Sequence, residues 1–169
     1  MKPQPSVELL GLDLAATDML LLSAAEFERR HHIRLGDYED SVSDLAESAR
    51  RALTERGLEP MWWRYLAIET SVRRVVGWCG FKGPPSKEGV VELVCGVYPG
   101  FEGQGYTSSM AKQLVKIAVR AGAKRVIAYT RPKANESTRL LRNLGFVLQE
   151  GETEAKPGSG WTWEHTPSG

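Results

Sequence analysis

Hydrophobic side chains in the first third of the chain recur with two spacings. Residues 6–10, with the sequence S-V-E-L-L, predict a short strand, and residues 14–33 carry apolar side chains at helical spacing. Thr17 or Asp18 could cap that helix. Residues 41–57 place their apolar side chains on one face and end at a glycine, which predicts a second, amphipathic helix.

The middle of the chain changes to the alternating pattern of strands. Residues 62–70 and 72–81 are rich in aromatic and β-branched side chains around a polar joint, which predicts a β-hairpin. Residues 82–89 are dense in turn formers, and residues 90–98 predict a third strand that ends at a Pro-Gly pair. Three antiparallel strands in succession are therefore expected.

Helical spacing returns from about Thr107 to a glycine at position 122. Residues 125–130 predict another strand, residues 135–144 a helix, and residues 146–149 and 160–165 two closing strands. The expected order is β-α-α-β-β-β-α-β-α-β-β. This order predicts an α/β fold in which helices cover a mixed sheet.

Length and composition bear on the number of domains, the expected partners and the expected location of the protein. The 169 residues, 41% of them hydrophobic, suit a single domain spanning residues 1–169. A net charge of +1 creates no global field for nucleic acid or an anionic membrane, so neither is an expected partner. No apolar stretch is long enough for a membrane span, and Cys79 and Cys95 lack the spacing of a zinc site. We expect a cytoplasmic protein with reduced cysteines and no metal.

A glycine-rich turn, Gly100 to Gly105, separates the third strand of this series from the helix that follows. Glycines allow positive φ and a close approach of the backbone, and helix-start amides attract anions, so a pyrophosphate could bind here. A purely structural turn is the alternative. The chain lacks G-x-x-x-x-G-K-[ST], and its glycine order and antiparallel strands argue against a Rossmann unit.

The residues around this turn resemble a known family. The segments V-V-E-L-V-C-G-V-Y-P-G-F-E-G-Q-G-Y-T-S-S-M, R-V-I-A-Y-T and N-E-S-T-R-L-L-R-N-L-G-F are similar to the GNAT superfamily of N-acetyltransferases. Within it, they resemble the branch of ribosomal-protein N-terminal acetyltransferases. The resemblance implies a mostly antiparallel sheet of about seven strands with helices on both faces. It also implies acetyl-CoA as co-substrate.

The resemblance implies a coenzyme site on the glycine turn and its neighbours. It assigns the backbone of residues 94–97 to the pantetheine arm, the amides of residues 101–107 to the pyrophosphate, and Asn135 to a pantetheine contact. The expected coenzyme-binding residues are Cys95, Gly96, Val97, Phe101, Glu102, Gly103, Gln104, Gly105, Tyr106, Thr107 and Asn135. Gly100 replaces the usual Arg or Gln of the family, Glu102 places a carboxylate inside the turn, and Asn135 lies one position late.

The resemblance also implies catalytic roles. Glu92 matches a strand glutamate that accepts the proton of the amine, although a solvated or salt-bridged glutamate is the alternative. Ser137 could protonate the leaving thiolate, or it could simply cap a helix. Leu141 stands where many relatives carry a tyrosine acid. Because no motif places either cysteine as a nucleophile, direct attack in a ternary complex is expected.

The acceptor is left open among a protein N-terminus, an amino acid and a small amine. Trp62, Trp63 and Tyr65 could line its pocket or pack in the core, with the two tryptophans on opposite faces. An acidic loop could bind a basic acceptor or be solvated; it comprises Asp37, Glu39, Asp40 and Asp44. A homodimer could form through an edge strand at residues 161–164. A catalytically silent acyl-CoA-binding domain and an unrelated nucleotide-binding module are the alternative functions.

Overall fold

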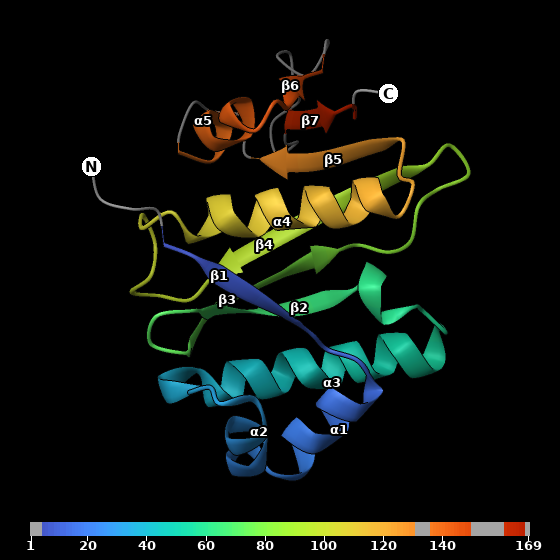
Figure 1. Ribbon diagram of the computed structural model, residues 1–169. Coiled ribbons are helices and arrows are strands. Elements are labelled where there is room, and N and C mark those ends of the chain that lie inside the picture. The colour runs from blue at the N-terminus through green and yellow to red at the C-terminus, as the bar shows by residue number, and fades with distance from the viewer. Residues whose placement is uncertain (1–4, 131–135, 150–160, 168–169) are drawn as a thin grey trace.

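Seven strands form one sheet in the computed structural model, which describes residues 5–130, 136–149 and 161–167 (Figure 1). Their spatial order is β1-β2-β3-β4-β5-β7-β6. The strands are β1 (Val7–Gly11), β2 (Arg64–Glu69), β3 (Arg74–Phe81), β4 (Val90–Val97), β5 (Arg125–Thr130), β6 (Val147–Leu148) and β7 (Trp161–His165). The order of elements along the chain agrees with the expected one, except that three helices rather than two lie between β1 and β2.

Antiparallel pairing dominates the sheet. Strands β2 to β4 pair antiparallel in succession, as expected, and β1 pairs antiparallel with β2. Strand β7 pairs antiparallel with both β5 and β6. Strands β4 and β5 are parallel, since α4 (Tyr106–Arg120) connects them as a crossover. The sheet is therefore mixed and mostly antiparallel, as the family resemblance implies.

The expectation that residues 161–164 form an edge strand is wrong. Strand β7 lies between β5 and β6 and pairs with each, so its backbone groups are engaged on both sides. The two-residue strand β6 forms that edge of the described sheet instead. The last strand in the sequence is not the last strand in the sheet, because β7 lies between β5 and β6.

Helices cover both faces of the sheet. On β2, Leu66 and Ile68 face the cluster formed with α1 (Leu14–Leu22), α2 (Ala24–His31) and α3 (Glu39–Glu55). Ala67 faces the opposite cluster, which includes residues of α4 and Leu141 of α5 (Glu136–Asn143). This alternation is the strand period of two. Among the described residues, no helix is long and apolar enough to cross a membrane.

The single helix expected over residues 14–33 is two helices, because Ser23 interrupts it. Ser23 has φ −157° and ψ 106°, and its hydroxyl accepts a hydrogen bond from the Glu26 N–H at 3.2 Å. The serine is thus the N-cap of α2. Apolar spacing continues across the break, so periodicity alone does not reveal it.

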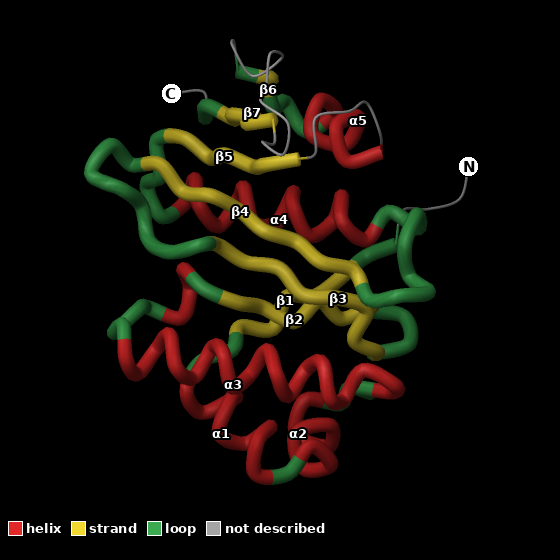
Figure 2. The backbone as a smooth tube through the Cα atoms, turned by 180° about the vertical axis from the view of Figure 1, so that it is seen from behind, coloured by secondary structure: helices red, strands yellow, loops and turns green. Residues whose placement is uncertain are grey.

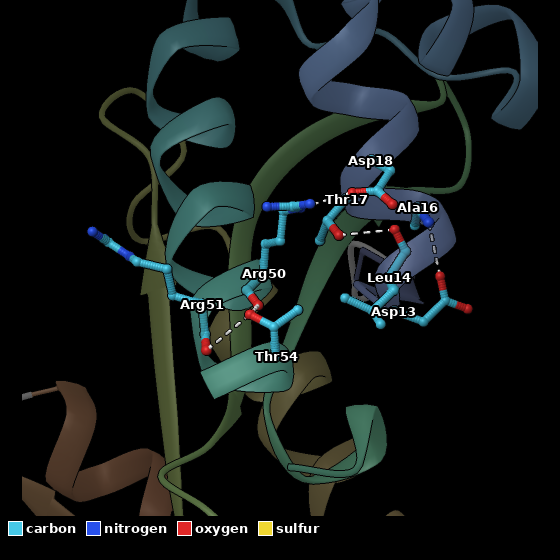
Figure 3. Close-up of polar contacts among 8 residues, drawn as sticks. All are labelled: Asp13, Leu14, Ala16, Thr17, Asp18, Arg50, Arg51 and Thr54. Carbon is cyan, nitrogen blue, oxygen red and sulfur yellow. Dashed lines mark hydrogen bonds and ion pairs between the residues drawn. The ribbon is translucent and has the colours of Figure 1, made fainter. Parts of the chain in front are cut away.

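Polar contacts at the start of α1 also differ from the expected capping (Figure 3). Asp13, not Thr17 or Asp18, caps the helix: its carboxylate accepts the Ala16 N–H at 2.8 Å. Thr17 is buried and donates to the Leu14 carbonyl at 3.0 Å. Asp18 instead accepts a hydrogen bond from Arg50 of α3 at 2.9 Å, which joins the two helices.

The first strand of the expected hairpin starts later than its aromatic residues suggest. Residues Pro60–Trp62 form a short 3-10 turn, and β2 begins at Arg64. Trp62 and Trp63 are buried in the two opposite clusters, as the expected alternation requires. Tyr65 is half-buried, and its hydroxyl donates to the Met61 carbonyl at 2.9 Å. These aromatic residues therefore pack in or against the core.

Candidate functional site

The glycine turn adopts a backbone that only glycine tolerates well. Gly100, Gly103 and Gly105 have φ values of 94°, 71° and 90°. Gly105 is the N-cap of α4, and no side chain caps the helix there. The first amides of α4 are therefore available to an anion, and the positive end of the helix dipole lies at the same place.

A cavity of about 280 Å³ opens at this helix start. The turn and the start of α4 form one wall, and α5 forms the other. Its lining residues are Phe101, Gly103, Gly105, Tyr106, Thr107, Ser108, Ser137, Arg139, Leu140 and Asn143. Five of the expected coenzyme-binding residues, Phe101, Gly103, Gly105, Tyr106 and Thr107, thus meet at one place.

The carboxylate of Glu102 is turned back onto its own loop. It accepts a hydrogen bond from the Gly100 N–H at 2.9 Å, and the Gln104 amide donates to the Gly100 carbonyl at 3.0 Å. Neither Glu102 nor Gln104 lines the 280 Å³ cavity. Both side chains therefore stabilise the turn at Gly100, the position where the family usually carries Arg or Gln.

Aromatic side chains support the turn, and one of them, Tyr38, comes from the N-terminal half of the chain. Tyr38 stacks on Tyr98 with ring centroids 4.7 Å apart, and its hydroxyl donates to the Pro99 carbonyl. Phe101 lies 5.8 Å from the Tyr38 ring and 6.2 Å from the Tyr106 ring. This packing fixes the turn relative to the helical layer, so its amides are preorganised.

Strands β4 and β5 separate beyond Glu92. Their parallel pairing covers only Val90 to Glu92 with Arg125 to Ile127, although β5 continues to Thr130. Residues 93–97 keep their pairing with β3. Within the described part of the chain, the edge of β4 that faces β5 therefore has no strand partner over these residues, which leaves backbone groups for a ligand.

A second cavity, of about 610 Å³, fills the fork between β4 and β5. Its walls come from β3, β4, β5, α4 and α5. It shares Thr107, Ser137 and Leu140 with the cavity at the helix start, so the two adjoin. An elongated ligand could run from the glycine turn into the fork.

Glu92 lies where the fork begins and lines the larger cavity. Its side chain is only 16% exposed, and its carboxylate forms an ion pair with Lys82 at 2.5 Å. The structure thus combines the two interpretations of this residue, a glutamate in the cavity wall and a salt-bridged strand glutamate.

Ser137 is exposed and lines both cavities from the first turn of α5. Asn135 lies outside the described residues. Leu141, at the position of the family's tyrosine, is buried in the core cluster with α4. Within the described residues, no group of three His, Cys, Asp or Glu side chains is arranged to hold a metal ion.

Residues Cys95, Gly96 and Val97 lie on β4 opposite Cys79, Trp78 and Gly77. Cys95 lines the fork cavity, and burial raises the pKa of its thiol to about 12. At neutral pH the thiol is therefore protonated and a poor nucleophile. Gly96 is required by packing, because a Cβ there would lie 2.5 Å from the Trp78 indole nitrogen.

Sequence reasoning missed several residues of the two cavities. Arg139 and Asn143 line the smaller one, and their spacing of four on a helix was an available signal. Trp78, Lys82 and Tyr129 line the larger one. These three follow from strand register, for which the sequence carries no direct signal.

Two charged features lie away from the glycine turn and the cavities. Arg120 is at the C-terminal end of α4, about 20 Å from the glycine turn at 1.5 Å per residue. The acidic loop of residues 37–44 includes Glu39 and Asp40 in the first turn of α3, where they favour the helix dipole. None of its residues lines either cavity.

Comparisons with known proteins match this chain to acetyltransferases. The family described as acetyltransferase (GNAT) domain matches residues 12–147. YjdG of Bacillus subtilis (strain 168), an uncharacterized N-acetyltransferase, is 26% identical over 158 residues, which cover 89% of this chain and 94% of YjdG.

Solved structures share the fold at low identity. RimL, a ribosomal L7/L12 alpha-N-protein acetyltransferase in complex with coenzyme A, has a TM-score of 0.63 and 17% identity, covering 97% of this chain and 96% of that one. The microcin C7 self-immunity acetyltransferase MccE, in complex with acetyl-CoA and AMP, has a TM-score of 0.63 and 13% identity, covering 98% of each chain. Because the family match begins directly after β1, ends at the first residue of β6 and contains the turn and the fork, the chain belongs to the GNAT acetyltransferase family.

Proposed function

We propose that this acetyltransferase binds acetyl-CoA along the two adjoining cavities and transfers the acetyl group directly to a primary amine. The observation that carries the proposal is the fork between β4 and β5, which begins at Glu92 and adjoins the uncapped start of α4. We propose that the chain acts as one domain over residues 1–169 and works in the cytoplasm.

The coenzyme has a polar end and an extended arm, and the site offers a matching surface for each. The pyrophosphate would bind the amides of residues 103–107, with the Arg139 guanidinium across the cavity. The pantetheine arm would lie along residues 95–97 of β4, whose edge has no strand partner on the β5 side. Backbone hydrogen bonds to an added extended chain are a common mode of recognition.

The chemistry requires two proton transfers. Glu92 would accept a proton from the amine, whose nitrogen attacks the thioester carbonyl. The C–N bond forms and the C–S bond breaks. Ser137 would donate its hydroxyl proton to the leaving thiolate and regain a proton from solvent. A backbone amide near Val97 would polarise the carbonyl. The raised pKa of Cys95, about 12, favours this direct route over an acyl-cysteine intermediate.

Titration calorimetry with acetyl-CoA tests the coenzyme site, and release of free thiol across a panel of amines tests the transfer. We expect binding, and thiol release with at least one amine. Lack of binding at millimolar acetyl-CoA would refute the proposal. Binding without thiol release would favour a silent acyl-CoA-binding domain, an alternative supported by the ion pair that already engages Glu92.

Glu92→Gln tests the proposed base. Because the amide cannot accept the proton, kcat should fall by about 10²- to 10⁴-fold, while the Kd of acetyl-CoA changes little. Glu88→Gln is the matched control, since Glu88 is exposed and lines neither cavity. Unchanged kcat in Glu92→Gln would remove Glu92 from the mechanism.

A further inference from the structure

We propose that the acceptor is a small primary amine with a carboxylate close to the amino group, as in a free α-amino acid, and that Lys82 selects it. This inference rests on the proposed function. It concerns the face of the sheet opposite α4, where the fork cavity reaches Glu92.

Three pairs of residues build this face, each pairing a residue of β3, or of the turn directly after it, with a residue of β4. Trp78 lies opposite Gly96 on the neighbouring strand, and Gly80 lies opposite Val94. The next residue pointing to the same face is Lys82, whose N–H donates to the Glu92 carbonyl at 2.9 Å. Figure 2 shows this side of β4 and β5 with α4 behind them, and no helix of the described part of the chain lies in front.

Aromatic rings flank the charged pair. The Trp78 indole lies against the Gly96 backbone, where a side chain would collide with it. Lys82 Nζ lies 5.5 Å from the centre of the Tyr129 ring. All three of these side chains line the fork cavity together with Glu92, so an acceptor in it would meet apolar walls and two opposite charges.

The two charges differ in depth. The Glu92 side chain is 16% exposed and the Lys82 side chain 57%, so the carboxylate lies inside the cavity and the ammonium at its rim. An amine that approaches the thioester must replace Lys82 at Glu92. Lys82 is then a free positive charge beside the bound amine, and it would repel a second cation.

A carboxylate next to the amino group resolves that repulsion, because it can pair with the released Lys82 ammonium. Arg64 adds positive charge on the same side, with its guanidinium 4.0 Å from the Trp63 ring centre and 5.5 Å from that of Trp78. Among the described residues that line the fork cavity, Glu92 is the sole carboxylate. A polyamine, or a peptide N-terminus with a neutral amide beside its amine, lacks the matching anion.

The test compares three matched acceptors with acetyl-CoA: a free amino acid, its α-amide, and a dipeptide that begins with the same residue. For the wild type, kcat/KM should favour the free acid by about tenfold or more, as expected for one charge-assisted hydrogen bond. Lys82→Met should lower this acid-to-amide ratio by at least about tenfold. Lys82→Arg, which keeps the charge, should largely retain it.

Lys87→Met is the matched control, because Lys87 is exposed in the same turn and lines neither cavity. A wild type that prefers the amide or the dipeptide would overturn the inference, and so would an unchanged ratio in Lys82→Met. A structural role of the ion pair alone would lower activity on all three acceptors equally. If coenzyme binds but none of these or other amines releases thiol, the proposed function itself fails.

Discussion

At the residue scale, Glu69 links the β2–β3 hairpin to α4, whose first residues line the 280 Å³ cavity. Its carboxylate accepts hydrogen bonds from the hydroxyls of Ser71 and Tyr106, both at 2.7 Å, and Arg74 lies 3.4 Å away. The hydrogen bonds from Ser71 and Tyr106 lower the pKa of Glu69, and burial opposes them. Tyr106 is the first residue of α4, so this carboxylate stabilises the start of the helix.

Glu69→Gln should lower the free energy of unfolding by about 1–2 kcal/mol at pH 7, because charged acceptors form stronger hydrogen bonds than an amide. The folded pKa lies below the ordinary value of 4.5, so the stabilisation is complete above pH 4.5 and is lost as the pH falls through the folded pKa. Urea unfolding at pH 7 and pH 3.5 measures this. An equal difference between wild type and variant at both pH values would contradict it.

At the element scale, the start of α4 and one face of α5 together form the smaller cavity. Helix α4 supplies amides without a side-chain cap, and α5 supplies Ser137, Arg139 and Asn143. Neither helix forms the cavity alone. The proposed anion site therefore depends on how α5 packs, and Leu141 holds α5 in the core shared with α4.

Arg139→Ala should raise the Kd of acetyl-CoA by about three- to tenfold, because one exposed cation opposite the α4 amides is lost. The effect should shrink at high salt. Calorimetry at two ionic strengths measures both expectations. Arg120→Ala removes the same charge from the far end of α4 and should leave the Kd unchanged. Equal effects of the two substitutions would indicate a nonspecific charge effect.

At the scale of the whole molecule, the fork divides the sheet. Strands β1 to β4 form one continuous antiparallel part, and β5, β7 and β6 form the other. Among the described strands, the two parts pair only through residues 90–92 and 125–127. A ligand in the fork would therefore connect two parts that share few backbone hydrogen bonds.

Saturating acetyl-CoA should slow amide hydrogen exchange in peptides that cover residues 93–97, since the ligand would occupy the open edge of β4. At 100 times the Kd, binding should add about 2.7 kcal/mol to the free energy of unfolding. Residues 64–69 of β2 pair on both sides already and serve as the internal reference. Protection of that reference without protection of residues 93–97 would place the coenzyme elsewhere.

Sequence patterns alone predicted the strand at Arg125–Thr130, the glycine turn before α4, and the element order apart from the break at Ser23. Apolar periodicity and positive-φ glycines are local properties, so they can be predicted without knowing the neighbours. The break at Ser23 was not predicted, because its capping hydrogen bond competes with a helical pattern that continues on both sides. The resemblance to the family, in turn, singled out Glu92 from the sequence motif alone.

Long-range packing determines which residues lie together around the two cavities. In the sheet, β7 lies between β5 and β6. The register of β3 and β4 places Lys82, which follows β3, opposite Glu92. The packing of α5 brought Arg139 to the start of α4. Pairing partners far apart in the chain are chosen by burial and hydrogen bonding of the whole sheet, and no local pattern encodes that choice.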